Sequence, residues 1–385
     1  MKPKYVEIHR REDCSGCCAC AAVCPHGAIR MVQDGMGFRY PEIDESLCVG
    51  CGLCEMVCAF KPITRTKAPE AYAIRFPEYL DRSQSGGLGY AVMCKAIEEG
   101  YVVYGAAMDE DFVVRHRRVE TMEGLEPLRL SKYVQSDMDG VPVLVLQDLK
   151  AGRKVLFTGT PCQCAGLGSL CSKYRENLIL VDLVCHGVPA PRVWAGFLDW
   201  SAKRKGAKIE RALFRDPSLG WHSSRTRLEY ESGEVAFCPN YYYLFIKDLI
   251  NRPSCGECPF ASTHRPSDMT IGDCWGIEKV QPGFADDNKG CSLLLVNTSD
   301  GESFFEGLSL SAGPVQLALE SVLQPSLCKA SPRHPKANLL EKEFIGKGYS
   351  RIESLFGVES LGEKVRRWLH KLNPTNTKLY RRITK

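Results

Sequence analysis

The stretch "CSGCCACAAVCP" (residues 14–25) places four cysteines at the spacing C-x2-C-x2-C-x3-C and follows them with a proline. The stretch "CVGCGLCEMVC" (residues 48–58) repeats the cysteine spacing without the proline. Short spacings of this kind let one loop wrap an iron–sulfur cube with three thiolates, while a fourth arrives from elsewhere in the chain. Zinc modules rarely show this run twice, so the repeat favours two 4Fe-4S clusters over zinc.

The ligands of each cluster follow from how such paired runs fold. In two-cluster ferredoxins the fourth cysteine of each run serves the other cluster. The predicted ligand sets are therefore Cys14, Cys17, Cys20 and Cys58 for one cluster, and Cys48, Cys51, Cys54 and Cys24 for the other. The stretch between the runs, residues 29–44, is typical of a hairpin that turns at Asp34–Gly37. We expect an α+β ferredoxin-like domain over residues 1–68, with Cys18 as a bystander.

The composition bounds the rest of the chain. Its 385 residues favour two or three domains, and 44% hydrophobic with 25% charged residues is typical of a globular protein. The first residues lack the apolar stretch of a signal peptide, and no run of 18 apolar residues occurs, so we expect a cytoplasmic protein. In a reducing compartment, 20 cysteines indicate metal or redox centres rather than cross-links.

The last residues are strongly basic. Residues 361–385 contain eight Lys and Arg against one acidic residue, whereas the rest of the chain is slightly acidic, which argues against nucleic-acid binding. We expect a basic helical tail over residues 331–385. Its apolar residues recur at helical spacing, namely Leu361, Val365, Trp368, Leu369 and Leu372. Such a helix docks on its own body or stays solvated, or else it contacts an acidic partner or an anionic membrane.

A second domain begins after a linker near residue 69. The turn Ser85–Gly89 opens a predicted helix of about ten residues that stops at Gly100, and an apolar strand starts at Tyr101. A turn that opens a helix offers backbone N–H groups to a phosphate. The stretch "LSKYVQS" (residues 130–136) adds a lysine and hydroxyls that suit phosphate or flavin contacts.

Further on, apolar strands alternate with helices. Strands are predicted at residues 153–159 and 177–185, with helices at 141–152 and 160–174. Continuous apolar strands alternating with helices predict an α/β domain with a mainly parallel sheet that is covered on both faces.

Several cysteines follow these strands. Cys162 and Cys185 lie just beyond the carboxyl ends of two strands, where open α/β sheets place their ligands. The loop "CGECP" adds Cys255 and Cys258, and "MTIGDCWG" adds Cys274. These thiols suit a third cluster, and the alternative is that "CGECP" is half of a zinc knuckle.

An ordered set of motifs carries a family resemblance. Along the chain occur "SQSGG", "SKYVQS", "GTPCQ", "VCHGVP", "CGECP", "DMTIGDCWG" and "KGCSLLLVNT". Together they resemble the family of coenzyme F420 hydrogenase/dehydrogenase beta subunits, in the branch with an N-terminal two-cluster ferredoxin domain. The resemblance covers about residues 10–330. It implies a domain over residues 69–330, with parts at about 69–152 and 153–330, that binds FAD and one 4Fe-4S cluster.

The resemblance also implies site residues. Cys162, Cys185, Cys255 and Cys258 match the cysteines of the family motif, whereas relatives commonly carry an aromatic residue at the place of Cys274. The residues that we assign to the flavin are Gln84, Ser85, Gly86 and Gly87, with Ser131, Lys132, Tyr133 and Thr160 as further cofactor contacts. His186 is either a structural histidine or a proton-transfer group. No catalytic residue is assigned.

The function expected from this resemblance is an FAD-dependent iron–sulfur oxidoreductase. It would pass electrons between clusters and a two-electron partner such as coenzyme F420 or a related substrate, because a flavin joins hydride chemistry to one-electron carriers. No nickel-binding motif is present. Two alternatives stay open: a non-catalytic electron-transfer subunit of a larger redox complex, and a binding protein whose cysteines hold zinc.

Overall fold

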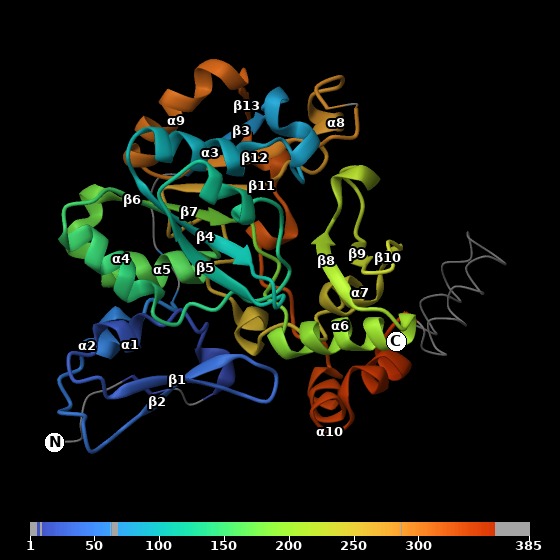
Figure 1. Cartoon of the computed structure of the whole chain (residues 1–385). Helices are drawn as coiled ribbons and strands as arrows, with labels where there is room; N and C mark the ends of the chain where they lie inside the picture. The colour runs from blue at the N-terminus through green and yellow to red at the C-terminus, as the bar shows by residue number, and fades with distance from the viewer. Residues whose placement is uncertain (1–5, 8–9, 62, 64–67, 286, 359–385) are drawn as a thin grey trace.

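The computed structural model describes residues 6–7, 10–61, 63, 68–285 and 287–358, and its centre is an eight-stranded sheet (Figure 1). The four central strands run parallel, whereas every strand outside them pairs antiparallel. This confirms the α/β class, with the parallel part confined to the middle. In sheet order the strands are β13 (Val315–Leu317), β3 (Glu70–Ile74), β12 (Ser292–Val296), β11 (Met269–Asp273), β7 (Leu178–Leu183), β6 (Val155–Gly159), β4 (Val102–Met108) and β5 (Val114–Val119).

Helices cover both faces of this sheet, because alternate strand residues point to opposite sides. Leu156 and Ile179 pack with α3 (Leu88–Glu98) and α9 (Ser299–Ala312). Phe157 and Leu178 pack on the other face with α4 (Val141–Lys150) and α5 (Pro161–Leu170). In Figure 1, α3 and α9 lie above the sheet, and α4 and α5 lie below it. The predicted strands and helices of this region are confirmed.

The first cysteine-rich segment folds as a small domain below α5 (blue in Figure 1). It contains α1 (Ala19–Val23), α2 (Leu53–Val57) and the hairpin of β1 (Ile29–Gln33) and β2 (Arg39–Ile43). The Asp34 carboxylate accepts hydrogen bonds from two backbone N–H groups of the turn, at 2.8 and 2.9 Å, which confirms the predicted hairpin. We call residues 10–61 the dicluster domain.

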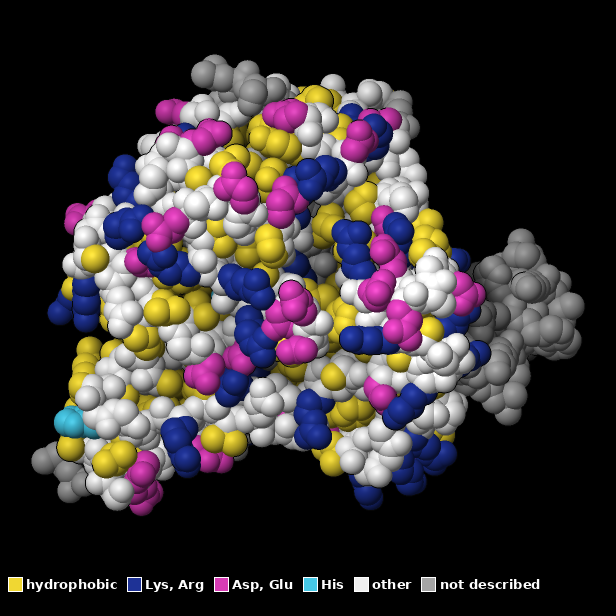
Figure 2. Space-filling model, in the orientation of Figure 1, with side chains coloured by type: hydrophobic (Ala, Val, Ile, Leu, Met, Phe, Trp, Pro, Cys, Tyr) yellow, Lys and Arg dark blue, Asp and Glu magenta, His cyan; other side chains and the backbone are white. Residues whose placement is uncertain are grey.

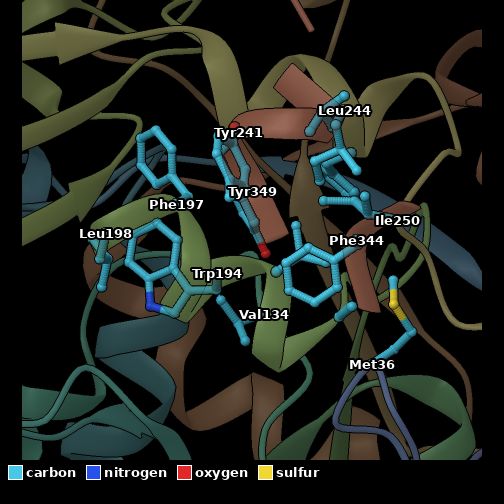
Figure 3. Close-up of a cluster of buried hydrophobic side chains, with 14 of the residues drawn as sticks. Met36, Val134, Trp194, Phe197, Leu198, Tyr241, Leu244, Ile250, Phe344 and Tyr349 are labelled. Atoms are coloured by element: carbon cyan, nitrogen blue, oxygen red, sulfur yellow. The ribbon is translucent and has the colours of Figure 1, made fainter. Parts of the chain in front are cut away.

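A lobe that the sequence did not lead us to expect packs beside the sheet. Its antiparallel sheet consists of β8 (Ile209–Phe214), β9 (Thr226–Tyr230) and β10 (Val235–Cys238). Three helices complete it: α6 (Pro191–Lys205), α7 (Asn240–Ile246) and α10 (Ala337–Phe356). Figure 3 shows how aromatic and aliphatic side chains from these helices, among them Trp194, Phe197, Tyr241 and Phe344, fill its core.

Short elements join these parts. They are α8 (Ile277–Val280) and 3-10 helices at Arg11–Asp13, Pro77–Arg82, Glu123–Leu128, Ser172–Asn177, Pro217–Leu219, Pro253–Glu257, Leu319–Val322 and Pro325–Leu327. None of the described helices has the length and apolar character needed to cross a membrane. The predicted tail helix around Trp368 lies outside the described residues.

Candidate iron–sulfur and flavin site

The first turn of α5 holds a cysteine at the end of a buried strand. β6 ends at Gly159, and Gln163 Oε1 accepts a hydrogen bond from the backbone N–H of Thr160 at 2.9 Å, which stabilises the start of the helix. Cys162 follows within this turn, and its sulfur lies 3.2 Å from Thr160 Oγ1 in a hydrogen bond. Thr160 therefore positions Cys162 rather than facing a cavity.

Three further thiols gather around Cys162. Cys185 follows β7, the parallel neighbour of β6, and the 3-10 helix Pro253–Glu257 brings in Cys255. Burial raises the pKa of Cys185, and the nearby thiols of Cys255, Cys162 and Cys258 raise it further. Thiols influence one another in this way only at short range. We call Cys162, Cys185, Cys255 and Cys258 the body set.

The four thiols of the body set do not converge on a single metal-ion position. In the part of the chain that the structure describes, no group of three or more His, Cys, Asp or Glu side chains is arranged to hold a metal ion. A four-iron cube is larger than an ion, so it needs thiols at separated corners. The Val188 N–H donates to the Cys255 sulfur at 3.4 Å, a contact of the kind that stabilises a thiolate.

Cys274 has different neighbours. Its buried thiol pairs with the thiol of Cys291, and this contact and burial together raise the pKa of Cys274. The two cysteines lie in an apolar cluster with Trp221 and Leu293. Cys274 is thus a packed core residue in this structure.

In the dicluster domain, cysteines of the two runs mix as predicted from their spacing. Burial raises the pKa of Cys20, and the thiols of Cys17, Cys14 and Cys58 add to this shift. We call these four the proximal set. A small cavity is lined by the other four, Cys24, Cys48, Cys51 and Cys54, which we call the distal set.

The proximal set lies directly against the body set. Burial raises the pKa of Cys17 to about 12, and Cys162 is among the thiols that add to the shift. The sulfur of Cys17 sits over Gly166 of α5, where an added Cβ would lie 2.5 Å from it. The glycine at position 166 of α5 thus permits the close approach of the Cys17 sulfur. The three thiol sets follow one another in the order distal, proximal, body.

A cavity of about 660 Å³ is lined by residues of the β4–β5 turn and of β8. Of the predicted flavin residues, Gln84, Ser131 and Lys132 line it. The surrounding face carries Lys and Arg intermixed with Asp and Glu (Figure 2). Its volume is within the usual range of small-molecule sites.

The other predicted flavin residues contact the protein itself. The Ser85 hydroxyl donates to the Cys291 carbonyl at 2.7 Å, and an added Cβ on Gly86 would lie 2.2 Å from the Ile74 carbonyl oxygen. Gly87 has φ +85° and packs against Phe76. These glycines therefore serve a tight turn against β3. Tyr133 packs edge-on to Phe214 and Tyr242.

Two residues that line the cavity carry a polar group that lacks a hydrogen-bond or ion-pair partner in the described part of the chain. The Gln84 side-chain oxygen is buried without a hydrogen-bond partner. Loss of water around Lys132 lowers its pKa to about 7. The Lys132 ammonium donates to the Arg129 carbonyl at 2.6 Å, and no carboxylate among the described residues forms an ion pair with it. An orphaned acceptor beside a lysine without a counter-ion suits a polar ring system such as a flavin.

The sequence reasoning missed a buried histidine, His116, which connects to Cys162 through Ser136, Gln163 and Thr160. Burial lowers the pKa of His116 to about 4, so the ring is neutral; its Nε2–H donates to the Thr158 carbonyl at 2.9 Å. Its Nδ1 accepts from Ser136, whose hydroxyl also accepts from Gln163 at 2.9 Å. Burial alternates along β5, and this pattern could have identified His116 as inward-facing.

His186, next to Cys185, is held by the protein. Its Nδ1 hydrogen-bonds the Ser331 hydroxyl at 3.2 Å, and its ring packs edge-on to Phe245. Its Nε2 lies 2.9 Å from an Asp248 oxygen but lacks the alignment of a hydrogen bond. These contacts fix the loop that follows β7.

Comparison with known proteins agrees with this arrangement. Residues 152–317 match the C-terminal region of the coenzyme F420 hydrogenase/dehydrogenase beta subunit, and residues 13–61 match a 4Fe-4S dicluster domain.

Among curated proteins, the chain is similar to one of the subunits of the F420H2 dehydrogenase of Methanosarcina mazei, with 24% identity over 48% of this chain and 56% of the relative. It is also similar to an iron-sulfur subunit of the CoB–CoM heterodisulfide reductase of Methanocaldococcus jannaschii, with 33% identity over 19% of this chain and 13% of the relative. The chain thus spans only part of both relatives.

Among solved structures, a chain of the F420-reducing [NiFe] hydrogenase complex from Methanosarcina barkeri aligns with a TM-score of 0.47 and 17% identity, over 74% of this chain and 90% of that one. The two matched regions carry the proximal, distal and body sets. Over residues 152–317 the chain is thus similar to the coenzyme F420 hydrogenase/dehydrogenase beta subunits, and over residues 13–61 it is similar to 4Fe-4S dicluster domains.

Proposed function

We propose that this chain is an iron–sulfur flavoprotein oxidoreductase that passes electrons between three 4Fe-4S clusters and FAD, to or from a two-electron partner such as coenzyme F420 or a related substrate. The carrying observation is that the Cys17 sulfur of the dicluster domain sits over Gly166 of α5, the helix that carries Cys162 of the body set. Thiols that are far apart in the sequence thereby form a continuous series. Such a series is what stepwise electron transfer requires.

Each thiol set would hold one cube. The proximal, distal and body sets supply four sulfurs each, the number that a 4Fe-4S cluster takes. In the body set, the Thr160 hydroxyl and the Val188 N–H contact cysteine sulfurs directly. Hydrogen bonds to ligating sulfurs stabilise the more negative, reduced cube and so raise its potential. Cys274 and Cys18 would remain outside the ligand sets.

The cavity would hold the flavin. When bound there, FAD exchanges two electrons as hydride with a partner and single electrons with the clusters. Gln84 Oε1 would accept from an N–H of the ring, and Lys132 and Ser131 would donate to its oxygens. His116, held neutral by burial, would keep Ser136 and Gln163 oriented between the cavity and Cys162. Ser85, Gly86, Gly87, Tyr133 and Thr160 would support this site from behind.

We further propose that the domain boundaries lie at about residues 68 and 330, with α10 of the C-terminal segment packed back onto the lobe, and that the chain works in the reducing cytoplasm. All 20 cysteines are free in the structure, as cluster ligands require before iron is bound. The basic tail beyond residue 358 would contact an acidic partner or an anionic membrane.

The alternative, a non-catalytic electron-transfer subunit, is favoured by one surface. Val49 and Met56, beside the distal set, are 63% and 74% exposed, and Leu47 and Leu53 of the same segment are exposed as well; several exposed apolar side chains together mark an interaction surface. Figure 2 shows hydrophobic side chains at the lower left, over the dicluster domain. A relative of this chain is itself named as a dehydrogenase subunit.

One preparation distinguishes these functions. The full chain is purified without oxygen, and its iron and flavin are counted; we expect about twelve iron atoms per chain, on the estimate of three four-iron cubes, and one FAD. Oxidation of reduced F420, or of a reduced dye, by the isolated chain supports the oxidoreductase. Full cofactor content without turnover supports the electron-transfer role. Zinc in place of iron contradicts both.

A further inference from the structure

One buried arginine joins the dicluster domain to the body of the protein. Arg252 is 1% exposed. Its Nε donates to the Cys14 carbonyl at 2.8 Å, one terminal nitrogen donates to the Arg39 carbonyl at 2.8 Å, and the other donates to the Gln135 side-chain oxygen at 3.0 Å. Its guanidinium also donates to the Cys14 sulfur at 3.7 Å. The side chain thus reaches a proximal-set cysteine from a loop that belongs to the body.

The partners of Arg252 are all neutral oxygens or a thiol. No carboxylate of the described residues forms a salt bridge with it, whereas Arg265, equally buried, pairs with Asp182 at 2.8 Å. The rings of Tyr40 and Phe38 lie 4.3 and 5.3 Å from its charge. Burying a charge without a counter-ion is costly, so a structure that keeps one needs an anion nearby.

The proposed clusters of the proximal and body sets would be the anions that offset the charge of Arg252. Arg252 contacts Cys14 of the proximal set, and its carbonyl accepts from the N–H of Cys255 in the body set. An added Cβ on Gly16 would lie 2.9 Å from the guanidinium, so the glycine leaves room for it. A cube with four thiolate ligands is negatively charged, and reduction adds one more negative charge. Arg252 is therefore placed between two such anions.

We propose that Arg252 is a positioning residue whose buried charge is shared by the proximal and body cubes and holds their reduction potentials above the value they would have without it. The proposal rests on the proposed function, because it needs cubes in both sets. A positive charge stabilises the reduced cube, and the effect is strong where water is excluded. Among the described residues, the contacts of Arg252 include Cys14 of the proximal set and no cysteine of the distal set, so the potential of the distal cube should depend less on Arg252.

The test is a redox titration of the full chain, followed by the electron paramagnetic resonance signals of the reduced cubes. Arg252→Gln removes the charge. We expect two potentials to fall, each by at least a tenfold change in electron partition, which is about 59 mV for a one-electron couple. The distal signal is identified by its loss in Cys51→Ser, and its reduction potential should not change. Arg252→Lys keeps the charge and should stay closer to the wild-type potentials.

A second variant covers the case in which Arg252→Gln fails to assemble. Gln135→Glu places a carboxylate at the position that accepts from Arg252, and it therefore neutralises the charge without removing the side chain. It should lower the same two potentials. The matched control is Arg10→Gln, which breaks the exposed Arg10–Glu257 ion pair of 2.9 Å between the same two parts of the protein. It should leave all three potentials in place.

The outcomes are distinct. Unchanged potentials in the charge-removing variants, an equal shift of all three signals, or the same shift in Arg10→Gln would each overturn the role of Arg252. A wild-type chain that lacks three cubes would instead remove the proposed function, and this inference with it. Iron counts made before each titration separate the two cases.

Discussion

The distal set and the body set group four cysteines by opposite routes. The distal cysteines lie within residues 24–54, and two short loops bring them around one cavity. The body set spans residues 162–258 and forms only because β6 and β7 pair in parallel and the 3-10 helix Pro253–Glu257 packs against their ends. Local spacing thus suffices where a loop wraps its own ligand, and elsewhere the sheet must form first.

The strongest test of this comparison removes one thiol from each set. Cys185→Ser should lower the iron content by about four atoms of about twelve, on the estimate of one cube lost from three, or leave a labile three-iron form. Cys51→Ser should remove the distal cube and spare the body cube. Iron analysis and the resonance signals measure both losses.

Two control variants belong to the same experiment. Cys274→Ser and Cys328→Ser, a buried and an exposed cysteine outside the three sets, should keep the full iron content. Loss of iron in Cys274→Ser, with none in Cys185→Ser, would reverse the assignment of the body set.

The flavin site is tested more directly at the cavity residue Lys132 than at the turn of Gly86 and Gly87. Lys132→Met removes a buried donor, and a hydrogen bond from a charged group contributes about 1.5–3 kcal/mol. FAD affinity should therefore fall roughly 10- to 150-fold, while iron stays complete. Flavin titration by fluorescence measures the change. Lys289→Met, at the cavity rim and paired with Asp81, is the control and should bind FAD normally.

The contact between the proximal set and α5 can be tested by adding a methyl group at Gly166. In Gly166→Ala the new Cβ would lie 2.5 Å from the Cys17 sulfur, and overpacking of this kind costs about 1–3 kcal/mol. The overlap outweighs the gain in helix propensity, which is at most about 1 kcal/mol. Denaturant unfolding should show a net loss of stability.

The matched control lies two residues further along α5. In Gly168→Ala the added Cβ would lie 3.1 Å from the end of the Leu180 side chain, which can move slightly. This variant should be neutral or stabilised. If the two alanines behave alike, the Cys17 contact does not depend on Gly166.

The last predicted effect is a pH dependence of the stability. The pKa of Lys132 falls from 10.5 to about 7 on burial, so between these values the unfolded chain binds a proton that the folded chain lacks. Flavin-free protein should therefore gain stability as pH rises from about 7 to about 10.5, by at most about 1.4 kcal/mol per pH unit. Lys132→Met should show a flatter profile, and equal slopes would contradict the lowered pKa.

Strand and helix patterns predicted much of the central fold. The predicted helix after Gly87 appears as α3, and the apolar runs around Phe157 and Leu180 appear as β6 and β7. The lobe of β8 to β10 was not predicted, although buried and half-buried residues alternate along β9. Short strands on a half-covered sheet give a weak signal, because their stability comes from the helices packed against them.

The sequence alone determined the cysteine spacing, and from that spacing it predicted the exchange of Cys24 and Cys58 between two loops, because a ligand wrap of this kind is local geometry. It also determined which cysteines follow β6 and β7. Only the tertiary structure decided the rest: that Gly86 packs on β3, that His116 connects to Cys162 through Ser136 and Gln163, and that Arg252 contacts two thiol sets without a carboxylate partner among the described residues. Those contacts join residues far apart along the chain. They depend on tertiary packing and burial, which no short segment of the sequence determines.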